Sequence, residues 1–292
     1  MSINFDLTYN KYLQVFDTEL NKALNSLTSA PKLLIDAMRY AIEGGGKRIR
    51  PVLCLASAET LNVDIKSILP YCVAIECIHS YSLVHDDLPA MDNDDYRRGK
   101  LSTHKKFGEA YGILAGDALL NFAFEYCLNN TNFTKYDAAA LKVLAQYAGY
   151  SGMIGGQVLD LQNEKNSVYN EDVLFSIYLN KTSKLLTAPL LIASELAGGK
   201  YKETLKEYGY NLGFMFQITD DIMDVEGTVE SIGKTPNKDA TEDKLTAIKV
   251  YGVAGAKEKN KQLYSRCIEL LNEIDGSEFL KDFTTKIYTR NK

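Results

Sequence analysis

Residues 74–87, AIECIHSYSLVHDD, join a repeating pattern of apolar side chains to a pair of aspartates. Spacings of three and four residues, which are typical of one face of an α-helix, separate Ala74, Cys77, Ile78, Tyr81 and Val84. The segment therefore predicts an α-helix with an acidic group of residues at its end.

The same helical period extends over most of the chain, whereas strict alternation with a period of two is hard to find. Near the C-terminus it relates Leu263, Tyr264, Cys267, Ile268, Leu271 and Ile274. It also covers residues 7–26, 31–43, 109–129, 135–150, 170–198 and 203–226. Glycines mark expected turns at 44–46, 155–156 and 198–199. The sequence predicts an all-α fold, with one domain over residues 1–292 built as a large helical bundle around one core.

The composition of the 292-residue chain, with 46% hydrophobic and 24% charged residues, excludes intrinsic disorder. A net charge of −5 argues against a protein that binds nucleic acid. No uncharged apolar stretch approaches the ~20 residues needed to cross a bilayer, and the N-terminal residues lack the pattern of a signal peptide. Five cysteines without a CxxC pair indicate reduced thiols. We therefore expect a cytoplasmic protein that does not span a membrane.

Five aspartates crowd into residues 86–95, inside the segment 85–100, HDDLPAMDNDDYRRGK. Two carboxylates ~4 Å apart repel by about 4 kcal/mol at an effective dielectric constant of ~20. The fold tolerates this repulsion if the carboxylates are spread in water or share a cation. Carboxylate oxygens are ligands for Mg²⁺ or Ca²⁺, but the EF-hand spacing is missing. These residues alone leave a solvated loop and a metal site equally open.

A second acidic group lies in residues 217–224, QITDDIMD. On an ideal helix with ~100° per residue, an arc of about 100° contains Gln217, Asp220, Asp221 and Asp224. Apolar residues occupy the other sides of the same helix, so a simple solvated surface does not explain these carboxylates. Buried charges need partners, which favours a functional site here.

Basic residues gather at 44–51, GGGKRIRP, and again at 97–98. These two places hold four of the seven arginines. Glycine lets backbone amides approach an anion, and arginine binds phosphate through paired hydrogen bonds. The first segment is not a Walker A loop, because Arg48 stands in place of Ser or Thr. Two acidic and two basic groups on a helical scaffold suggest a substrate whose phosphates are bridged by a divalent metal.

These segments, in this order, resemble the trans-isoprenyl diphosphate synthases, and among them the bacterial short-chain members. The similarity covers residues 35–246. Its two Asp-rich motifs are 86–92, followed by Arg97-Arg98-Gly99, and 220–224. The other matching segments are the isopentenyl diphosphate segment 45–51, the pair Lys181-Thr182, and Gly155-Gly156-Gln157 with Asp160.

The resemblance implies an all-α homodimer with the isoprenoid synthase fold, in which two Asp-rich helices face each other across a deep central cavity. It implies diphosphate substrates and Mg²⁺ as the cofactor, with three ions in each active site. The metal ligands that it implies are Asp86, Asp92 and Asp220, with Asp87, Asp221 and Asp224 as further ligands or supporting groups. The residues that it implies for isopentenyl diphosphate are Gly46, Lys47, Arg50, His79 and Arg98.

The remaining implied roles concern the allylic substrate and the product. The resemblance places the allylic diphosphate on Arg97, Lys181 and Lys234. It places the developing allylic cation near Lys181, Thr182 and Gln217. It assigns the limit of the pocket for the growing chain to Tyr81 and Ser82. Around residues 235–247 the chain departs further from the family pattern, so the roles of Lys238 and Lys244 stay open.

The implied reaction is ionisation, condensation and elimination to give farnesyl diphosphate, because a bulky ring at Tyr81 goes with short products. A geranylgeranyl diphosphate synthase is the alternative within the family. The helical pattern by itself is also compatible with simpler roles. Tyr81 could be an ordinary aromatic residue of the core, and His79 could be a polar residue on a half-buried helix.

Three further classes share parts of the pattern. An HD-type metal phosphohydrolase would use the adjacent pair His85-Asp86, but it needs further histidines, and only His79 and His104 remain. A terpene cyclase would share the first Asp-rich motif without needing the basic segment 45–48. A non-catalytic synthase subunit would show degraded Asp motifs, and both motifs are intact in this chain.

Overall fold

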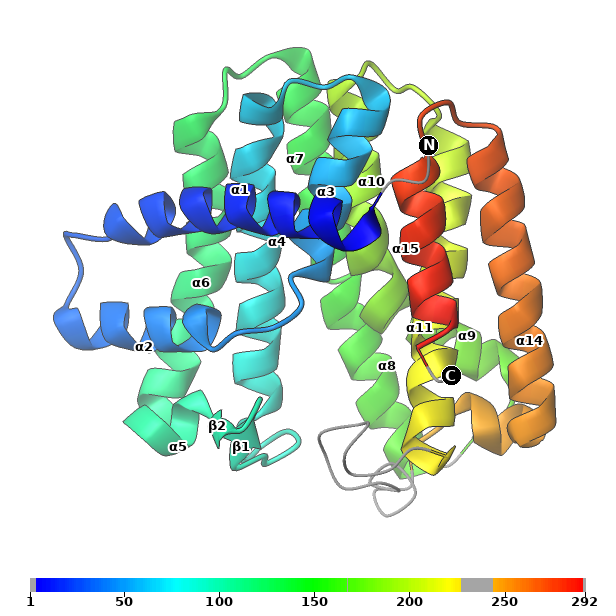
Figure 1. Ribbon diagram of the computed structural model, residues 1–292. Coiled ribbons are helices and arrows are strands. Elements are labelled where there is room, and N and C mark those ends of the chain that lie inside the picture. Colours follow the sequence, from blue (N-terminus) through cyan, green and yellow to red (C-terminus); the bar gives the residue numbers. More distant parts are fainter. Residues whose placement is uncertain (1–3, 167, 227–243, 291–292) are drawn as a thin grey trace.

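The computed structural model describes residues 4–166, 168–226 and 244–290, and helices make up most of this part of the chain (Figure 1). The first half contains α1 (Phe5–Asn25), α2 (Lys32–Glu43), α3 (Ile49–Leu61), α4 (Ile65–Asp86), β1 (Tyr96–Arg97), β2 (Lys100–Leu101), α5 (Thr103–Phe107), α6 (Glu109–Asn130) and α7 (Lys135–Ala148). The second half contains α8 (Met153–Asn166), α9 (Glu171–Ile177), the π-helix η1 (Tyr178–Ser183), α10 (Lys184–Leu196), α11 (Lys202–Glu226), α14 (Ala247–Asn272) and α15 (Glu278–Tyr288). The prediction of an all-α fold is confirmed.

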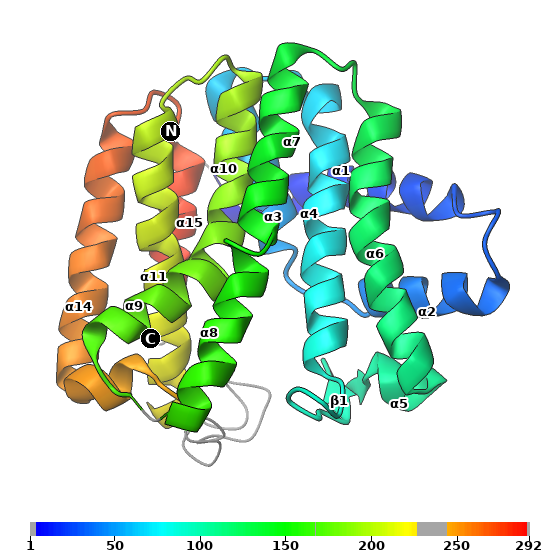
Figure 2. The ribbon, with the colours of Figure 1, turned by 180° about the vertical axis from the view of Figure 1, so that it is seen from behind.

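Helices α4 and α10 form the centre of the bundle. Every residue from 70 to 78 in α4 and from 185 to 194 in α10 is buried. A helix that is apolar on all sides needs neighbours on all sides. Accordingly α4 packs against α3, α6 and α10, and α10 packs against α3, α7 and α11. Figure 2 shows α10, α7, α4 and α6 running along the bundle, and Figure 1 shows α1 and α2 crossing it.

Both acidic helices end on the same side of the bundle. Helix α4 ends at Asp86 and α11 ends two residues after Asp224, and Figure 1 shows both ends at the bottom of the molecule. The short hairpin β1–β2, with Tyr96 opposite Leu101, lies beside the end of α4. The fold therefore places the two Asp-rich motifs at one end, as the resemblance implies.

The turn predicted at Gly155 and Gly156 is wrong, because both glycines lie inside α8. A Cβ atom on Gly156 would lie 2.1 Å from the backbone nitrogen of Lys181. Glycine at this position lets α8 approach η1 closely. Sequence reading cannot separate this role from a turn, since glycine marks both. The turns at 44–46 and 198–199 are confirmed by positive φ angles at Gly45, Gly46, Gly198 and Gly199.

Helix α4 is long and apolar enough to cross a membrane by length and composition, but 72% of its most apolar window is buried inside this protein. That burial is the environment of a core helix. All five cysteines are buried free thiols, as expected from the absence of a CxxC pair. They are Cys54, Cys72, Cys77, Cys127 and Cys267.

Candidate active site

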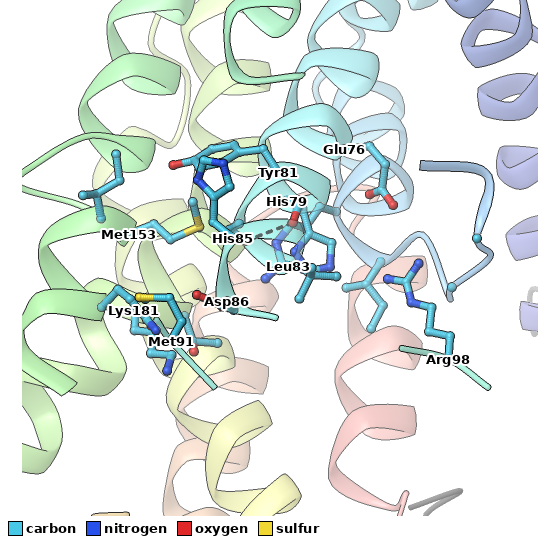
Figure 3. A pocket seen from close by; sticks show the side chains of 18 of the residues that line it. Glu76, His79, Tyr81, Leu83, His85, Asp86, Met91, Arg98, Met153 and Lys181 are labelled. Carbon is cyan, nitrogen blue, oxygen red and sulfur yellow. Dashed lines mark hydrogen bonds between the residues drawn. The ribbon is translucent and has the colours of Figure 1, made fainter. Parts of the chain in front are cut away.

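A cavity of about 1070 Å³ lies among α4, α6, α8, η1, α11 and the segment that leads into α3. Its wall brings together the basic segment before α3, the acidic end of α4 and the Lys-Thr pair of η1, and Figure 3 shows part of this wall. A second cavity of about 180 Å³ contains carboxylates of α11. Three residues, Lys181, Thr182 and Gln217, line both cavities. They therefore stand where the two spaces meet.

Basic side chains form one wall of the large cavity, which is lined by Lys47, Arg50, His79 and Arg98. Arg98 donates a hydrogen bond to the carbonyl oxygen of Gly45, which joins the β1–β2 turn to the segment before α3. The buried Nε atom of Arg50 has no hydrogen-bond partner among the residues that the structure describes. Burial, followed by repulsion from Arg50 and Arg98, holds the pKa of His79 well below its usual range. The wall suits a ligand with several negative charges.

A buried carboxylate, Glu76, also lines this wall and was missed by sequence analysis. Arg48 donates to Glu76 Oε1 at 2.6 Å and to the carbonyl oxygen of Ile42 at 2.6 Å. Both charged side chains are buried, so loss of either partner would leave an uncompensated charge. The pair ties the turn that carries Lys47 to α4, just before Arg50 in the first turn of α3. The signal in the sequence was an acidic residue inside an otherwise apolar repeat.

The opposite wall begins at Asp86, the last residue of α4. Burial raises the pKa of Asp86 to about 6, with attraction to Lys181 opposing the rise and repulsion from Asp92 adding to it. Asp92 lies in the loop after α4, and its Oδ1 atom is 3.8 Å from Nζ of Lys244. Lys181 also forms an ion pair with Asp160 of α8. A cation placed beside Asp86 would favour its ionised form.

The carboxylates of the three aspartates of α11 lie in different surroundings. Asp220 and Asp221 line the second cavity, and Asp220 Oδ1 lies 3.1 Å from Nη1 of Arg290. Asp221 is buried and accepts a hydrogen bond from the hydroxyl group of Tyr178. Asp224 is also buried, and it lines neither cavity. Sequence analysis missed Arg290 because it lies far from both Asp-rich motifs along the chain.

The π-helix η1 carries Lys181 and Thr182 into the junction of the cavities. The hydroxyl group of Thr182 donates a hydrogen bond to Gln217 Oε1 at 3.2 Å. Gln217 Nε2 in turn donates to Asp221 Oδ1 at 3.4 Å. This chain of hydrogen bonds joins η1 to the acidic face of α11. A π-helical turn inside a longer helix is often found at a functional site, but no residue pattern in this segment announced it.

Four predicted site residues line neither cavity, namely Asp87, Asp92, Arg97 and Asp224. Arg97 donates to Asp87 Oδ1 from Nε at 2.9 Å and also from Nη2. Asp87 is 2% exposed, and both residues line a separate small pocket. Of the remaining predicted residues, Lys234 lies outside the described residues, as does Lys238.

The apolar part of the large cavity lies below Asp86 along α4. Tyr81 and Ser82 both line it, and Ser82 Oγ donates to the carbonyl oxygen of His79 at 2.9 Å. Figure 3 shows the ring of Tyr81 beside the ring of His85, with Met153 of α8 nearby. Tyr81 is 5% exposed, so it forms a packed wall between the acidic end of α4 and the core.

The donor set fits Mg²⁺ that binds together with a phosphate ligand. No three His, Cys, Asp or Glu side chains within the described ranges are close enough to hold a metal by themselves. Mg²⁺ usually takes one or two carboxylates and completes its shell with phosphate oxygens and water. Asp86 lines the large cavity and Asp220 the smaller one, so both would offer such carboxylates to a bound cation, and burial raises the pKa of Asp86 to about 6 in the absence of one.

The described histidines do not form the metal cluster of an HD-type phosphohydrolase. His85 Nε2 lies 3.0 Å from the carbonyl oxygen of Ile113, and His104 Nδ1 lies 3.0 Å from Oγ of Ser102. His85 Nε2 also lies 3.9 Å from Oδ1 of Asp117, and neither of these contacts is with another histidine. This alternative loses its support.

Comparisons with known proteins point the same way as the geometry. Residues 31–281 match the polyprenyl synthetase family. A farnesyl diphosphate synthase from Micrococcus luteus is 41% identical over 291 residues, which cover 98% of each chain. A geranylgeranyl diphosphate synthase from Cyanophora paradoxa is 42% identical over 260 residues, with 87% of this chain and 86% of that one covered.

A solved structure shows the same fold. The crystal structure of a geranyltransferase from Helicobacter pylori, complexed with magnesium and isoprenyl diphosphate, superimposes with a TM-score of 0.84. Its sequence is 31% identical, and the match covers 99% of this chain and 97% of that one. With the paired cavities, the ordered motifs and full-length similarity in agreement, the chain belongs to the polyprenyl synthetase family, and its enzyme class is that of the short-chain trans-prenyltransferases.

Proposed function

We propose that the protein condenses isopentenyl diphosphate with dimethylallyl or geranyl diphosphate in a Mg²⁺-dependent reaction and releases farnesyl diphosphate. The observation that carries this proposal is the junction of two cavities at Lys181, Thr182 and Gln217. Cations line one side of this junction and carboxylates line the other. Such an arrangement suits two diphosphates, one held by positive side chains and one held through metal.

The basic wall is the proposed site for isopentenyl diphosphate. Gly46, Lys47, Arg50, His79 and Arg98 all line the large cavity. A diphosphate there would give the buried Nε atom of Arg50 a hydrogen-bond acceptor. The bound anion would also offset the mutual repulsion of the cations, which favours binding in a partly dry site.

The acidic side is the proposed site for the allylic diphosphate and three Mg²⁺ ions. Asp86, Asp92 and Asp220 are the proposed ligands, and Asp87, Asp221 and Asp224 support them or complete the set. When bound, Mg²⁺ neutralises the diphosphate as a leaving group. Lys181 would add a positive charge next to the allylic diphosphate. Arg97 would add another, after its guanidinium group leaves Asp87 and binds the phosphate instead. Lys234 keeps its implied role as a proposal.

The chemistry asks the chain to stabilise charge and to exclude water. Departure of diphosphate leaves an allylic cation, which the isopentenyl double bond attacks before a proton is lost to the released diphosphate. Gln217 and Thr182 line the junction, and their oxygen dipoles would stabilise a positive charge that develops beside them. A nucleophilic side chain is not required by this sequence of steps.

The position of Tyr81 favours a product of fifteen carbons. Tyr81 is packed into the wall below Asp86, about 7.5 Å from it along an ideal helix. Each additional buried CH₂ group is favourable by ~0.8 kcal/mol, so an open pocket would accept a further five-carbon unit. A packed ring yields little and therefore stops growth. Geranylgeranyl diphosphate is the alternative product.

The direct test offers radiolabelled isopentenyl diphosphate and Mg²⁺ with each allylic diphosphate in turn, and sizes the products by chromatography. We expect a fifteen-carbon end product from both dimethylallyl and geranyl diphosphate. A twenty-carbon end product would favour the alternative, and absence of any labelled prenyl product would overturn the proposal.

We also infer that the chain works as one domain within a homodimer. Apolar side chains of α6 and α8 are exposed in the single chain, among them Leu114 at 52%, Ile113 at 47% and Val158 at 49%. Ile113 and Val158 also line the large cavity, so a second copy over this face would shield the cavity from water. Light scattering should give twice 32.6 kDa, and a monomer at micromolar concentration would contradict the inference.

Five buried free thiols support a reducing compartment such as the cytoplasm.

A further inference from the structure

Two rings stand one above the other on α4 at the wall of the large cavity. Tyr81 and His85 are four residues apart and therefore share one face of the helix. Their ring centroids lie 5.7 Å apart with an interplanar angle of 79°, which is an edge-to-face contact. Both residues line the cavity, and Figure 3 shows them in contact.

The ring of His85 is fixed from the neighbouring helix α6. Its Nε2 atom lies 3.0 Å from the carbonyl oxygen of Ile113 and 3.9 Å from Oδ1 of Asp117. Because a carbonyl oxygen only accepts hydrogen bonds, Nε2 carries the proton and donates it. Gly116 provides the space, since a Cβ atom there would lie 2.0 Å from Nε2. The imidazole therefore occupies a slot on α6 with a defined orientation.

The ring of Tyr81 has no such polar anchor. Its hydroxyl group is buried and has no hydrogen-bond partner within the part of the chain that is described. The orientation of the phenol is therefore set by packing, which includes the edge-to-face contact with His85. If the imidazole were removed, the phenol would gain space to turn out of the cavity.

From this geometry we infer that His85 is a positioning residue for Tyr81, and that the slot at Gly116 sets product length by holding the imidazole against the phenol. The inference rests on the proposed prenyl transfer, in which Tyr81 limits the growing chain. It adds a second layer to that limit: α6 holds His85, and His85 holds Tyr81. Product length then depends on the contact between α4 and α6 and not on Tyr81 alone.

The test compares product distributions of His85→Ala, Tyr81→Ala and the double variant. Loss of an edge-to-face contact should raise the ratio of twenty-carbon to fifteen-carbon product in His85→Ala by about tenfold. The double variant should show the ratio of Tyr81→Ala alone, because His85 acts through the ring that is already absent. An unchanged product ratio in His85→Ala would overturn the inference. A ratio in the double variant that equals the product of the two single effects would also overturn it.

The matched control is His104→Ala on α5, which removes another buried imidazole that does not line the large cavity. Its product ratio should equal that of the unmodified protein, and an equal shift in this variant would also overturn the inference. Because His85 adjoins Asp86, Gly116→Ala provides a second route that displaces the imidazole from α6. It should change the ratio when Tyr81 is present and have no effect in Tyr81→Ala.

The outcomes separate this inference from the proposed function. If the unmodified protein forms prenyl products and the ratios of Gly116→Ala and His85→Ala stay unchanged, only the positioning role fails. If the unmodified protein forms no prenyl product, the proposed function itself fails.

Discussion

Arg97 and Arg98 are neighbours in the sequence, yet their guanidinium groups lie in different surroundings. Arg98 lines the large cavity beside the basic wall, whereas Arg97 binds Asp87 outside it. We predict that Arg98→Ala mainly raises the KM for isopentenyl diphosphate, and that Arg97→Ala mainly raises the KM for the allylic substrate. Steady-state kinetics with each substrate varied in turn measures the split. Equal losses for both substrates in both variants would contradict this division.

The carboxyl group of Asp86 links the site to the stability of the fold. Its pKa is raised from 3.8 to about 6, so the folded state binds more protons than the unfolded state between these values. The unfavourable contribution is absent below about pH 4 and complete above about pH 6, where it amounts to about 3 kcal/mol. With chelator at pH 7.5, Asp86→Asn should therefore raise the Tm, and at pH 4 the gain should vanish.

Thermal unfolding in chelator and in Mg²⁺ checks this prediction. Bound Mg²⁺ favours the ionised carboxylate, so the advantage of Asp86→Asn should disappear when the metal is present. Asp36→Asn, at an exposed ion pair with Lys32 on α2, is the matched control and should leave the Tm nearly unchanged. A lower Tm for Asp86→Asn in chelator at pH 7.5 would show that Asp86 is not strained by burial.

At the level of single residues, the sequence identified groups that belong to motifs and missed the groups that hold them. Lys47, Arg50 and Asp86 were predicted from their clusters, and the structure places them on the cavity wall. Glu76 and Arg290 act through tertiary contacts with Arg48 and Asp220. Such contacts join positions far apart in the chain, so no local spacing reveals them.

Among the elements, the contact between α8 and η1 is the most sensitive to substitution. A Cβ atom on Gly156 would collide with the backbone of residues 180–181, where no side chain can move away. Overpacking of this kind costs about 1–3 kcal/mol or more. We predict that Gly156→Ala lowers the Tm by several degrees and also lowers kcat, because the strain moves Lys181 and Thr182 away from the junction.

Calorimetry and kinetics of Gly156→Ala together check this prediction, since a purely structural glycine would change the Tm without changing kcat of the folded fraction. Gly255→Ala is the control, because its Cβ atom would lie 2.9 Å from that of Tyr251 on α14, outside both cavities, and should lower the Tm without lowering kcat. A Gly156→Ala protein with the kcat and Tm of the unmodified protein would contradict the role given to this contact.

Helical period alone located most elements to within a few residues. Residues 109–129 were predicted as a helix, and α6 spans Glu109–Asn130. The period did not reveal η1, because a π-helical turn inside a continuous helix changes the backbone register without interrupting the apolar pattern. It also did not show that Gly155 and Gly156 lie within α8, because their role depends on a neighbouring helix.

For the whole molecule, the sequence supported an all-α fold with charged groups gathered in one place. The sequence did not reveal the shape of the cavities around which these charged groups gather. The separation into a cavity of about 1070 Å³ and one of about 180 Å³ depends on how α4, α8 and α11 pack. The same is true of the exposed apolar face of α6 and α8, whose residues look like core residues in the sequence.

Metal dependence of turnover tests the central claim most directly, namely that carboxylates of α4 and α11 serve one prenyl-transfer site. The measurement is the rate of label transfer from isopentenyl diphosphate to geranyl diphosphate in Mg²⁺, in excess chelator, and after Mg²⁺ is restored. We predict that chelator abolishes turnover, that Mg²⁺ restores it, and that Asp86→Ala and Asp220→Ala each lower kcat by several orders of magnitude while the variants stay folded. Turnover in chelator close to that in Mg²⁺, or near-normal kcat in both folded variants, would contradict the account.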